Sequence, residues 1–455
     1  MHKPVKSIIG IAFFGIITHP VSYAGGFSLY TEGSAVEIGN FAAGAAAEAA
    51  DASTGWYNPA GLVLIHQQQA VFSGVGVFPS SKLTGTSTFT TTPYAPYIQS
   101  FSGLQGAENA VVPAFHYALP LADDFTFGFS VTSPFGLSTN WGNESPVRYQ
   151  GTLSQLITVN MSPELGGKIS DNYSIGAGLD LQWAQVKFNS TLGSPAHLQS
   201  GNVSPYEYDS PSDNEGTAFD VGFHAGILGI YNDNHTRIGL NYQSAIRHAF
   251  NGTSVLSGRL ADPYLFDPSA VFRSDTLSSS EVELPNIVVL SGYQDINPKL
   301  ALLSSIVYTG WKSTEITNLS LNQVAAFSDV TFSQVLVNVL QEKHYKDAWR
   351  FALGTNYHVN DQWMMRLGAG YDQTPTTDAE RDVRLPDADR FALAIGAHYQ
   401  MRPNLGFDVG YSYLWACKSS PINKTDILSE SSSYNVHAQA KTHAQLAGIQ
   451  AVWKI

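Results

Sequence analysis

The sequence predicts an all-β protein: a 14-stranded antiparallel transmembrane β-barrel with an N-terminal plug inside its lumen. From about residue 67 to the last residue, short segments alternate apolar residues with glycine, polar or charged ones. In the clearest segment, Leu405 to Trp415, every second residue is apolar and most of these are aromatic. Because successive side chains of a strand point to opposite faces, the pattern predicts one apolar and one polar face. Its recurrence about 14 times, with aromatic residues near the segment ends, is typical of a barrel whose outer face meets lipid.

The composition agrees with many strands and disfavours several other classes of protein. Of the 455 residues, 44% are hydrophobic and only 13% are charged, which does not suit a disordered chain. The sequence has no apolar run of about 18 residues or more, so it predicts no membrane-spanning helix. A net charge of −13 makes nucleic acid a poor partner. The single cysteine, Cys417, cannot form an internal disulfide.

Residues 1–24 are predicted to be a signal peptide. Lys3 and Lys6 precede the short apolar run Ile8 to Ile17, and the small residues Ser22 and Ala24 follow it. A basic start, an apolar core and small residues before the cleavage point are the features of secretory signals, so we expect cleavage after Ala24. A membrane anchor is the alternative, but the apolar run is too short to span a bilayer.

Residues 25–66 do not follow the two-residue alternation. They are rich in small residues, as in Ala42 to Ala47, and end in the run Trp56 to Leu62. A compact segment of this kind, ahead of the first strand, is either a periplasmic domain or a plug. A barrel of about 14 strands is wide enough to need filling if it is not an open pore, so we expect an N-terminal hatch, or plug, over residues 25–66.

The barrel domain is predicted over residues 67–455, with connections that alternate between short and long. We expect a break in the fourth strand at Pro163 and a bulge in the last strand near Gly448. Short turns on one side and long loops on the other match periplasmic turns and extracellular loops. The strands are expected near 69–78, 111–119, 124–134, 155–169, 173–188, 217–231, 235–250, 281–294, 299–316, 345–359, 362–373, 389–401, 403–417 and 436–455. The long loops are expected at 79–110, 135–154, 190–216, 251–280, 317–344, 374–388 and 418–435.

Several sequence blocks follow one another along the chain: Gly25-Gly26-Phe27, Asp51 to Leu62 with its Asn58-Pro59-Ala60 motif, Lys346 to Arg350, and Leu385 to Phe391. With the strand count, they resemble the FadL-type family of outer-membrane transporters for long-chain fatty acids and other hydrophobic compounds. The resemblance implies a hatch inside the barrel, an external apolar groove and a deeper pocket near the mature N-terminus. It also implies a kinked third strand that opens the wall sideways.

The resemblance leaves the substrate open between fatty acids and aromatic hydrocarbons. Fatty-acid members of the family carry a basic residue on the fifth strand that helps to meet the carboxylate. The corresponding stretch here reads Trp183-Ala184-Gln185-Val186-Lys187, which departs from that pattern. Relatives that import aromatic hydrocarbons share the same motifs and need no anionic ligand.

Two basic residues are candidates for binding an anionic ligand. If Trp349, Phe351 and Leu353 face lipid, alternation turns Arg350 and, less strictly, Lys346 toward the lumen. A cation that is partly shielded from water favours a carboxylate through a charge-assisted hydrogen bond. The same alternation turns four more charged residues inward, where we expect them to form ion pairs that hold the hatch: Arg366, Asp372, Arg390 and Asp408.

Other candidate residues belong to the hatch and to the third strand. Phe27 could contact the apolar part of a ligand, with plain packing inside the plug as the alternative. The motif Asn58, Pro59 and Ala60 is expected to be structural, because asparagine caps or turns a chain and proline fixes its φ. Pro134 and Gly136 end the third strand and are expected to form a lateral opening, since proline lacks a ladder donor and glycine marks bends.

The predicted function is passive uptake of hydrophobic molecules across an outer membrane by a monomer that uses no cofactor and no metal. Loops 251–280 and 317–344 carry apolar residues that could capture a substrate, alongside contacts with membrane lipid and lipopolysaccharide. A general porin, a phospholipase-type enzyme and a surface receptor are the alternatives. The chain has no Gly-x-Ser-x-Gly elbow, phosphate loop or dinucleotide motif that would indicate an enzyme.

Overall fold

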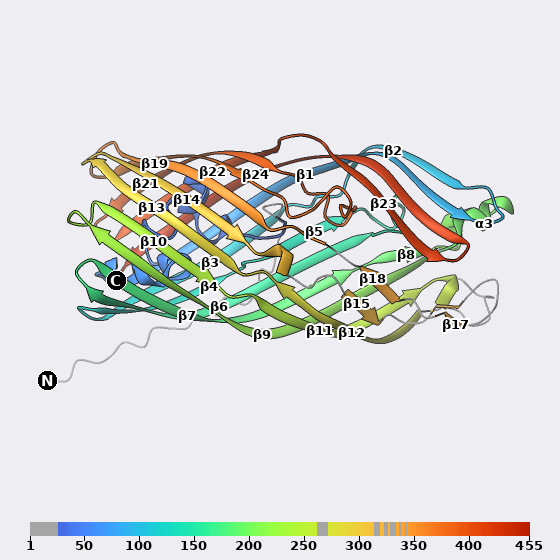
Figure 1. The fold of residues 1–455 in the computed structure, drawn as a ribbon, viewed down its shortest axis with the longest axis horizontal. Helices are drawn as coiled ribbons and strands as arrows, with labels where there is room; N and C mark the ends of the chain where they lie inside the picture. Colours follow the sequence, from blue (N-terminus) through green and yellow to red (C-terminus); the bar gives the residue numbers. More distant parts are fainter. Residues whose placement is uncertain are drawn as a thin grey trace.

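The computed structural model describes residues 26–261, 272–313, 319–322, 326–327, 334–335, 338–341 and 344–455. The predicted signal peptide therefore lies outside the described residues. As the alternation predicted, 14 antiparallel strands close into a barrel, and each of them pairs with the next (Figure 1). In order around the wall they are β1 (Gln69–Thr91), β3 (Ala110–Ala122), β4 (Phe125–Thr132) continued by β5 (Gly136–Asn140), β6 (Leu153–Ser170), β7 (Tyr173–Phe188), β9 (Ser210–Tyr231), β10 (Thr236–Gln243), β13 (Ile287–Asn297), β14 (Leu300–Thr309), β19 (Ala348–His358), β20 (Trp363–Asp372), β21 (Arg390–Arg402), β22 (Leu405–Ala416) and β24 (Ser432–Lys454).

Parts of the expected long loops are strands, which corrects the sequence prediction. β1 runs 13 residues beyond its expected end at 78, to Thr91, and pairs with β2 (Tyr97–Gln105). Likewise β11 (Ile246–Ser257) pairs with β12 (Phe272–Leu284), and β23 (Ser420–Ser429) pairs with β24. Segments such as Thr84 to Thr91 are rich in threonine, which favours strands without an apolar face, so alternation did not reveal them. The remaining elements are β8 (Ser190–Leu192), α3 (Pro195–Ser200), η3 (Pro205–Glu207), η4 (Arg259–Ala261), η5 (Trp311–Ser313), β15 (Leu319–Asn322), β16 (Ala326–Phe327), β17 (Gln334–Val335) and β18 (Asn338–Gln341).

Of the two irregularities expected in the wall, one is absent and the other is present on one side of its strand. β24 keeps one register against β1 from Thr91↔Ser432 to Gln69↔Lys454, so no bulge occurs at Gly448. The apparent change of phase arises because Leu446 faces inward and packs against the hatch in a buried apolar cluster. β6 continues through Pro163, which pairs with Phe129 of β4, but its ladder with β7 lacks pairs at Ser162 and Pro163, so the expected interruption occurs on that side.

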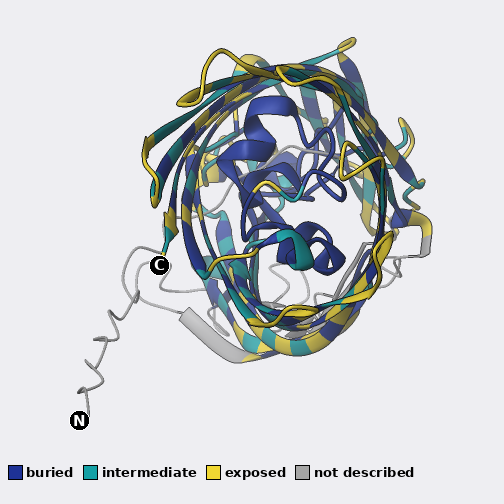
Figure 2. Cartoon of the chain, turned by 90° about the vertical axis from the view of Figure 1, so that its left-hand side faces the viewer, coloured by how far each residue is buried: buried dark blue, intermediate teal, exposed yellow. Residues whose placement is uncertain are grey.

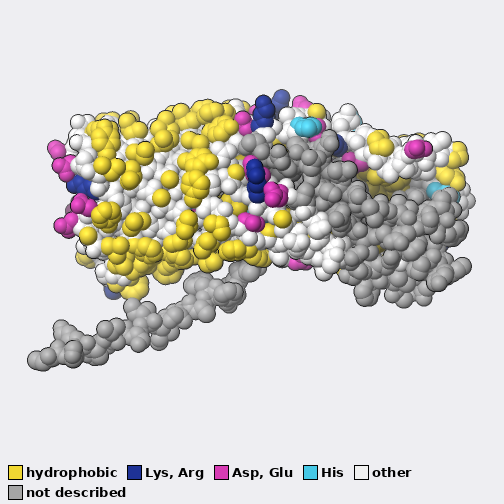
Figure 3. Space-filling view, turned by 60° about the horizontal axis from the view of Figure 1, so that its bottom comes forward, with side chains coloured by type: hydrophobic (Ala, Val, Ile, Leu, Met, Phe, Trp, Pro, Cys, Tyr) yellow, Lys and Arg dark blue, Asp and Glu magenta, His cyan; other side chains and the backbone are white. Residues whose placement is uncertain are grey.

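Figure 3 shows an apolar belt on the half of the barrel that carries the short turns, and exposed apolar side chains occur on wall strands from β1 (Phe72) to β24 (Ile449). Outward side chains such as Leu353, Leu393 and Ile449 are exposed there, and charged residues gather at the two rims of the belt (Figure 3). The opposite half, which carries the long hairpins, extends beyond the belt. None of the helices in the described part of the chain is long and apolar enough to cross a bilayer. The belt marks the membrane and places the long hairpins on the extracellular side.

The segment before β1 lies inside the barrel, where Figure 2 shows it as a buried mass within the ring of strands. Its elements are η1 (Thr31–Gly33), α1 (Ala35–Asn40), α2 (Thr54–Tyr57) and η2 (Pro59–Leu64). α1 packs against β20, β21, β22 and β24, whereas η2 packs against β4, β6, β7 and β9 on the opposite wall. A Cβ atom at Gly368 of β20 would lie 2.3 Å from the carbonyl oxygen of Asn40, so only glycine permits this close approach. The hatch is thus wedged between both walls.

Candidate functional site

The third strand of the barrel is interrupted. β4 ends at Thr132 and β5 begins at Gly136, and Pro134 between them has no amide hydrogen for the ladder. The ladder between β3 and β4 stops at Phe115↔Val131. Beyond that pair, the described residues of β3 and β5 share no ladder, although a single bridge joins Ala107 to Thr139 farther along. The wall therefore lacks a stretch of main-chain pairing beside Pro134 and Gly136.

The start of the hatch covers the inner side of this interruption. The Gly136 amide donates to the Phe27 carbonyl at 2.9 Å, and the Leu29 amide donates to the Pro134 carbonyl at 2.8 Å. Ser28 lies opposite Phe135 in an isolated bridge. The N-terminal segment thus takes the place of a short strand at the point where the third strand loses its neighbour.

Phe27 belongs to a buried aromatic cluster. Its ring centroid lies 4.5 Å from that of Trp311 and 6.3 Å from that of Phe135, and these last two rings are 6.2 Å apart. Tyr345 adds a fourth ring, 6.1 Å from Trp311. Aliphatic side chains from the barrel wall and one loop extend the same apolar surface: Leu137, Leu156, Ala184, Val307, Ala348 and Leu385. The cluster connects the start of the hatch, the interrupted strand and the extracellular mouth of the lumen.

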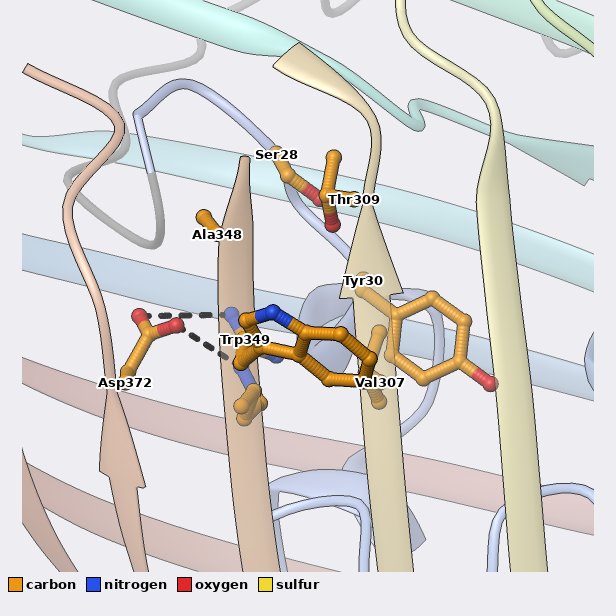
Figure 4. A pocket seen from close by; sticks show the side chains of 8 residues that line it. Ser28, Tyr30, Val307, Thr309, Ala348, Trp349 and Asp372 are labelled. Carbon is orange, nitrogen blue, oxygen red and sulfur yellow. Dashed lines mark hydrogen bonds and ion pairs between the residues drawn. The ribbon is translucent and has the colours of Figure 1, made fainter. Parts of the chain in front are cut away.

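A small pocket lies beside this cluster, between the start of the hatch and the wall (Figure 4). Its empty volume is about 250 Å³, open space included, which is below the usual 300–1,000 Å³ of ligand pockets. A ligand with a long chain would therefore need the N-terminal segment to move. The lining residues come from the hatch, β14, β19 and β20: Ser28, Tyr30, Val307, Thr309, Ala348, Trp349, Arg350 and Asp372.

The two predicted basic residues lie in different places. Arg350 lines the pocket and is buried, but its Nε donates to Asp372 Oδ1 at 3.2 Å. Arg390 also donates to Asp372, at 3.0 Å, so one carboxylate serves two guanidinium groups (Figure 4 shows Asp372 beside β19). Lys346 is exposed and is not among the lining residues, and its amide donates to the carbonyl of Pro375 at 2.9 Å. Roles of Lys346 and Arg350 in ligand binding stay predictions.

The Asn58-Pro59-Ala60 motif ties the hatch to itself and to the wall. The Asn58 side chain accepts from the Ala60 amide at 3.1 Å and donates to the carbonyls of Ala46 and Ile227 at 2.7 and 3.1 Å. Pro59 occupies the first turn of η2, where no amide hydrogen is needed. These contacts are structural. The side chains predicted to face inward are likewise buried and paired, Arg366 with Asp408 at 2.7 Å.

Comparison with known proteins gives the family. The family model described as "Outer membrane protein transport protein (OMPP1/FadL/TodX)" matches residues 16–454. The chain belongs to the OMPP1/FadL/TodX family. The "Long-chain fatty acid transport protein" of Salmonella typhi is 29% identical, covering 90% of this chain and 91% of that protein. "Outer membrane protein P1" of Haemophilus influenzae is 25% identical, with coverages of 90% and 91%.

Solved structures share the FadL-family fold. A Pseudomonas aeruginosa FadL homologue matches with a TM-score of 0.80 and 24% identity, covering 94% of this chain and 99% of that one. The toluene transporter TodX of Pseudomonas putida matches with a TM-score of 0.62 and 16% identity, with coverages of 88% and 92%. This member of the family is an outer-membrane transporter of hydrophobic compounds in a Gram-negative bacterium, and it is a channel without enzymatic activity.

Sequence reasoning missed two residues of the site. Trp311 falls within the strand expected at 299–316, but β14 ends at Thr309, so the residue lies beyond the strand that alternation describes. Asp387, inside the last of the family blocks, accepts hydrogen bonds from the Gly26 amide at 3.0 Å and from Thr374 at 2.7 Å. Within the described ranges, no group of three or more His, Cys, Asp or Glu side chains is arranged to hold a metal ion.

Proposed function

We propose that this FadL-family protein takes up long-chain fatty acids or other hydrophobic compounds by diffusion and releases them sideways into the membrane. The observation that carries the proposal is the pairing of the hatch start with the interrupted third strand. Two main-chain hydrogen bonds, at Phe27 and Leu29, close the inner side of the gap. Displacing one short segment would therefore enlarge the pocket and open the wall together.

Sideways release agrees with the chemistry of the substrate. An apolar molecule that left the barrel for the periplasm would expose its surface to water, whereas one that entered the bilayer would keep apolar contacts. The outer face of β4 carries Phe127, Phe129 and Val131 toward the gap, and all three are partly exposed. The gap at Pro134 and Gly136 thus opens next to the apolar belt.

Each predicted residue has a part in this proposal. Phe27 and Arg350 contact the ligand in the pocket, and the exposed Lys346 meets an anionic head group at the extracellular mouth. Pro134 and Gly136 form the lateral opening, while Asn58, Pro59 and Ala60 hold the hatch in the lumen. Capture begins at loops 251–280 and 317–344, although residues 262–271 and most of 314–343 lie outside the described part.

Three further expectations belong to the same proposal. Cleavage after Ala24 removes residues 1–24 and leaves residues 25–66 as the hatch and 67–455 as the barrel. The mature protein acts as a monomer without a cofactor. Outer-membrane lipid and lipopolysaccharide surround its apolar belt.

Filling the gap tests the exit route. Gly136→Trp should block uptake of labelled oleate and of labelled toluene, because both would pass the same opening. The matched control is Gly74→Trp, since a Cβ at Gly74 meets no atom within 4 Å. Heat-modifiable mobility of both variants would show that equal amounts of folded barrel are compared. Uptake by Gly136→Trp at the unmodified rate would contradict lateral release here.

A second candidate is import of aromatic hydrocarbons, which the cluster of Phe27, Phe135, Trp311 and Tyr345 favours. Aromatic side chains pack edge-to-face on aromatic ligands and require no charge. Uptake of oleate and toluene by the same cells distinguishes the two candidates. A general porin would instead conduct ions through an open lumen, and the hatch wedged between both walls opposes this.

A further inference from the structure

Two lysines face each other on the outer surface of the barrel. Lys82 of β1 and Lys441 of β24, here called the lysine pair, are directly opposite in the ladder between these strands. Both are exposed, and they lie on the same strand face as the exposed apolar residues Phe72 of β1 and Ile449 of β24. Like charges that are directly opposite across two strands destabilise the sheet. The lysine pair therefore stabilises the barrel only if an anion lies beside it.

The protein itself does not supply that anion. In the described part of the chain, no carboxylate lies within ion-pair distance of either ammonium group. Other outward cations of the extracellular half are paired: Lys187 Nζ lies 3.4 Å from Glu215, and Arg247 Nε lies 2.7 Å from Glu283. The lysine pair thus differs from its surroundings in having repulsion where the other cations have attraction.

An acid in the neighbouring connection is engaged elsewhere. Lys82 also pairs with Gln105 of β2, and Glu108 follows three residues later. The Glu108 carboxylate accepts hydrogen bonds from Ser138 Oγ at 2.8 Å and from Asn140 Nδ2 at 2.9 Å, both on β5. Glu108 is therefore held against the interrupted third strand and leaves the lysine pair without a counter-charge.

The lysine pair lies just beyond the extracellular rim of the apolar belt. Gln445 of β24 pairs with Phe78 of β1 on one side and with Tyr413 of β22 on the other, and both rings are exposed. Aromatic side chains at the end of an apolar belt mark the level of the lipid head groups. Lys441 lies four residues farther along β24, which is about 13 Å along a strand and about 10 Å along the membrane normal at the usual tilt. The two ammonium groups are thus at the height of the outer head groups.

A third lysine adjoins the pair. Lys418 is exposed in the connection between β22 and β23, and the strand residues on either side of this connection pair with His443 and Ala440 of β24. Lys441 lies between those two positions. Below it, the ring centroid of the partly exposed His443 lies 6.2 Å from that of Tyr413. Cationic surface therefore continues directly into aromatic surface, which matches an amphiphile with an anionic head.

We propose that the lysine pair, with Lys418 beside it, binds a phosphate group of lipopolysaccharide, whose acyl chains lie along the belt against Phe78 and Tyr413. Lysine ammonium groups are compact charges with three donors each, so two of them can share one phosphate. The pair lies on the extracellular side, and the outer leaflet of a Gram-negative outer membrane is the lipopolysaccharide leaflet. The inference goes beyond the proposed transport and does not depend on it.

The first test measures binding of lipid A that carries both phosphates to the purified full-length protein in nonionic detergent, by native mass spectrometry. Each lysine near an anionic lipid surface contributes about fivefold, so Lys82→Gln combined with Lys441→Gln should weaken binding about 5- to 30-fold. Lipid A without phosphates should bind the wild type and this variant alike. Unchanged binding of phosphorylated lipid A, in a variant with normal heat-modifiable mobility, would overturn the proposal.

The matched control makes the same change in net charge at the other end of the barrel. Lys168 and Lys299 are exposed beside short periplasmic turns, and Lys168→Gln combined with Lys299→Gln should leave lipid A binding unchanged. An equal loss in this control would attribute binding to net charge and overturn the proposal. Phosphatidylglycerol is the second control ligand. If it binds as tightly as lipid A and loses as much with the lysine pair, the assignment to lipopolysaccharide is wrong.

A charge reversal distinguishes binding from a structural role of the lysines. Without lipid A, Lys82→Glu should raise the midpoint of thermal unfolding, because opposite charges then face each other across the two strands. Added lipid A should raise the midpoint of the wild type but not that of Lys82→Glu, since a ligand stabilises only a protein that binds it. A lower midpoint for Lys82→Glu without lipid A, or equal stabilisation of both proteins by lipid A, would overturn the proposal.

Discussion

At the scale of single residues, Asp372 joins two buried guanidinium groups. Replacing it with alanine would leave Arg350 and Arg390 without their shared carboxylate, beside the pocket. Breaking a buried ion pair in this way costs about 3–5 kcal/mol, because an uncompensated charge remains. We expect Asp372→Ala to lower the free energy of unfolding by that amount, measured by guanidinium titration of the barrel in lipid vesicles.

Glu215 provides the comparison for this prediction. Its side chain is 47% exposed and lies 3.4 Å from the ammonium group of Lys187, which is itself partly exposed. Surface ion pairs contribute about 0–1 kcal/mol, since water already solvates both charges. Glu215→Ala should therefore change the unfolding free energy by less than about 1 kcal/mol. Equal effects of the two substitutions would show that burial does not govern the ion pairs of this barrel.

Lys346 differs from Arg350 in where it could act. Its exposed side chain can attract an anion before the anion enters the lumen, on a protein whose net charge is −13. We expect Lys346→Ala to slow initial oleate uptake by a factor of about 2–10 at low salt, and to leave toluene uptake unchanged. Added salt should remove the difference, because it screens exposed charges. A salt-independent loss would place Lys346 in the pocket instead.

At the scale of elements, the strand glycines determine how the hatch fits. A Cβ at Gly239 of β10 would lie 1.8 Å from the carbonyl oxygen of Ala46. Gly239→Val should therefore push the hatch off this wall, at a cost of about 1–3 kcal/mol, and raise single-channel conductance in planar bilayers. Gly74→Val, where a Cβ meets nothing within 4 Å, should leave conductance as it is. Normal conductance of a folded Gly239→Val barrel would show that the hatch yields without opening the lumen.

Alternation predicted the barrel strands because the lipid and the lumen impose opposite demands on neighbouring residues. Lipid contact requires apolar side chains, which Phe407, Val409 and Tyr411 of β22 provide, whereas the lumen accepts polar ones such as Asp408. Beyond the membrane no face of a strand contacts lipid, so the outward residues need not be apolar and the threonine-rich end of β1 shows no alternation. Leu446 explains the wrong prediction of a bulge. It points inward but is apolar because it packs against the hatch, so the apolar pattern shifts there although the register does not.

The site was less accessible to sequence reasoning than the fold. Alternation turned Arg350 inward correctly, yet it could not show that Asp372 occupies its guanidinium. Trp311 and Asp387 reach the site from segments between barrel strands, where the spacing of residues does not determine direction. Such positions depend on loop conformation, which only the three-dimensional structure reveals.

At the scale of the whole molecule, the apolar belt determines which substitutions of outward residues destabilise the barrel. Leu353, 69% exposed, lies in the middle of β19 within the belt, whereas Ile427, 75% exposed, lies on β23 beyond it. Leu353→Arg should destabilise the barrel in lipid by about 2–4 kcal/mol, the cost of a cation near the bilayer midplane. Ile427→Arg should stay within about 0.5 kcal/mol. A similar cost for both would move the membrane boundary to include β23.

The hydrogen bond from the Gly26 amide to Asp387 also bears on the order of biogenesis. Asp387 belongs to the connection between β20 and β21 on the extracellular side, so the beginning of the hatch is anchored deep in the closed barrel. Cleavage after Ala24, as proposed, would leave a single residue ahead of Gly26. An unprocessed precursor would instead have to thread its whole leader past Phe27 and the aromatic cluster. If the leader is cleaved after Ala24, we therefore expect cleavage to precede insertion of the hatch into the barrel, and a precursor that escaped the peptidase to have its own transport path obstructed.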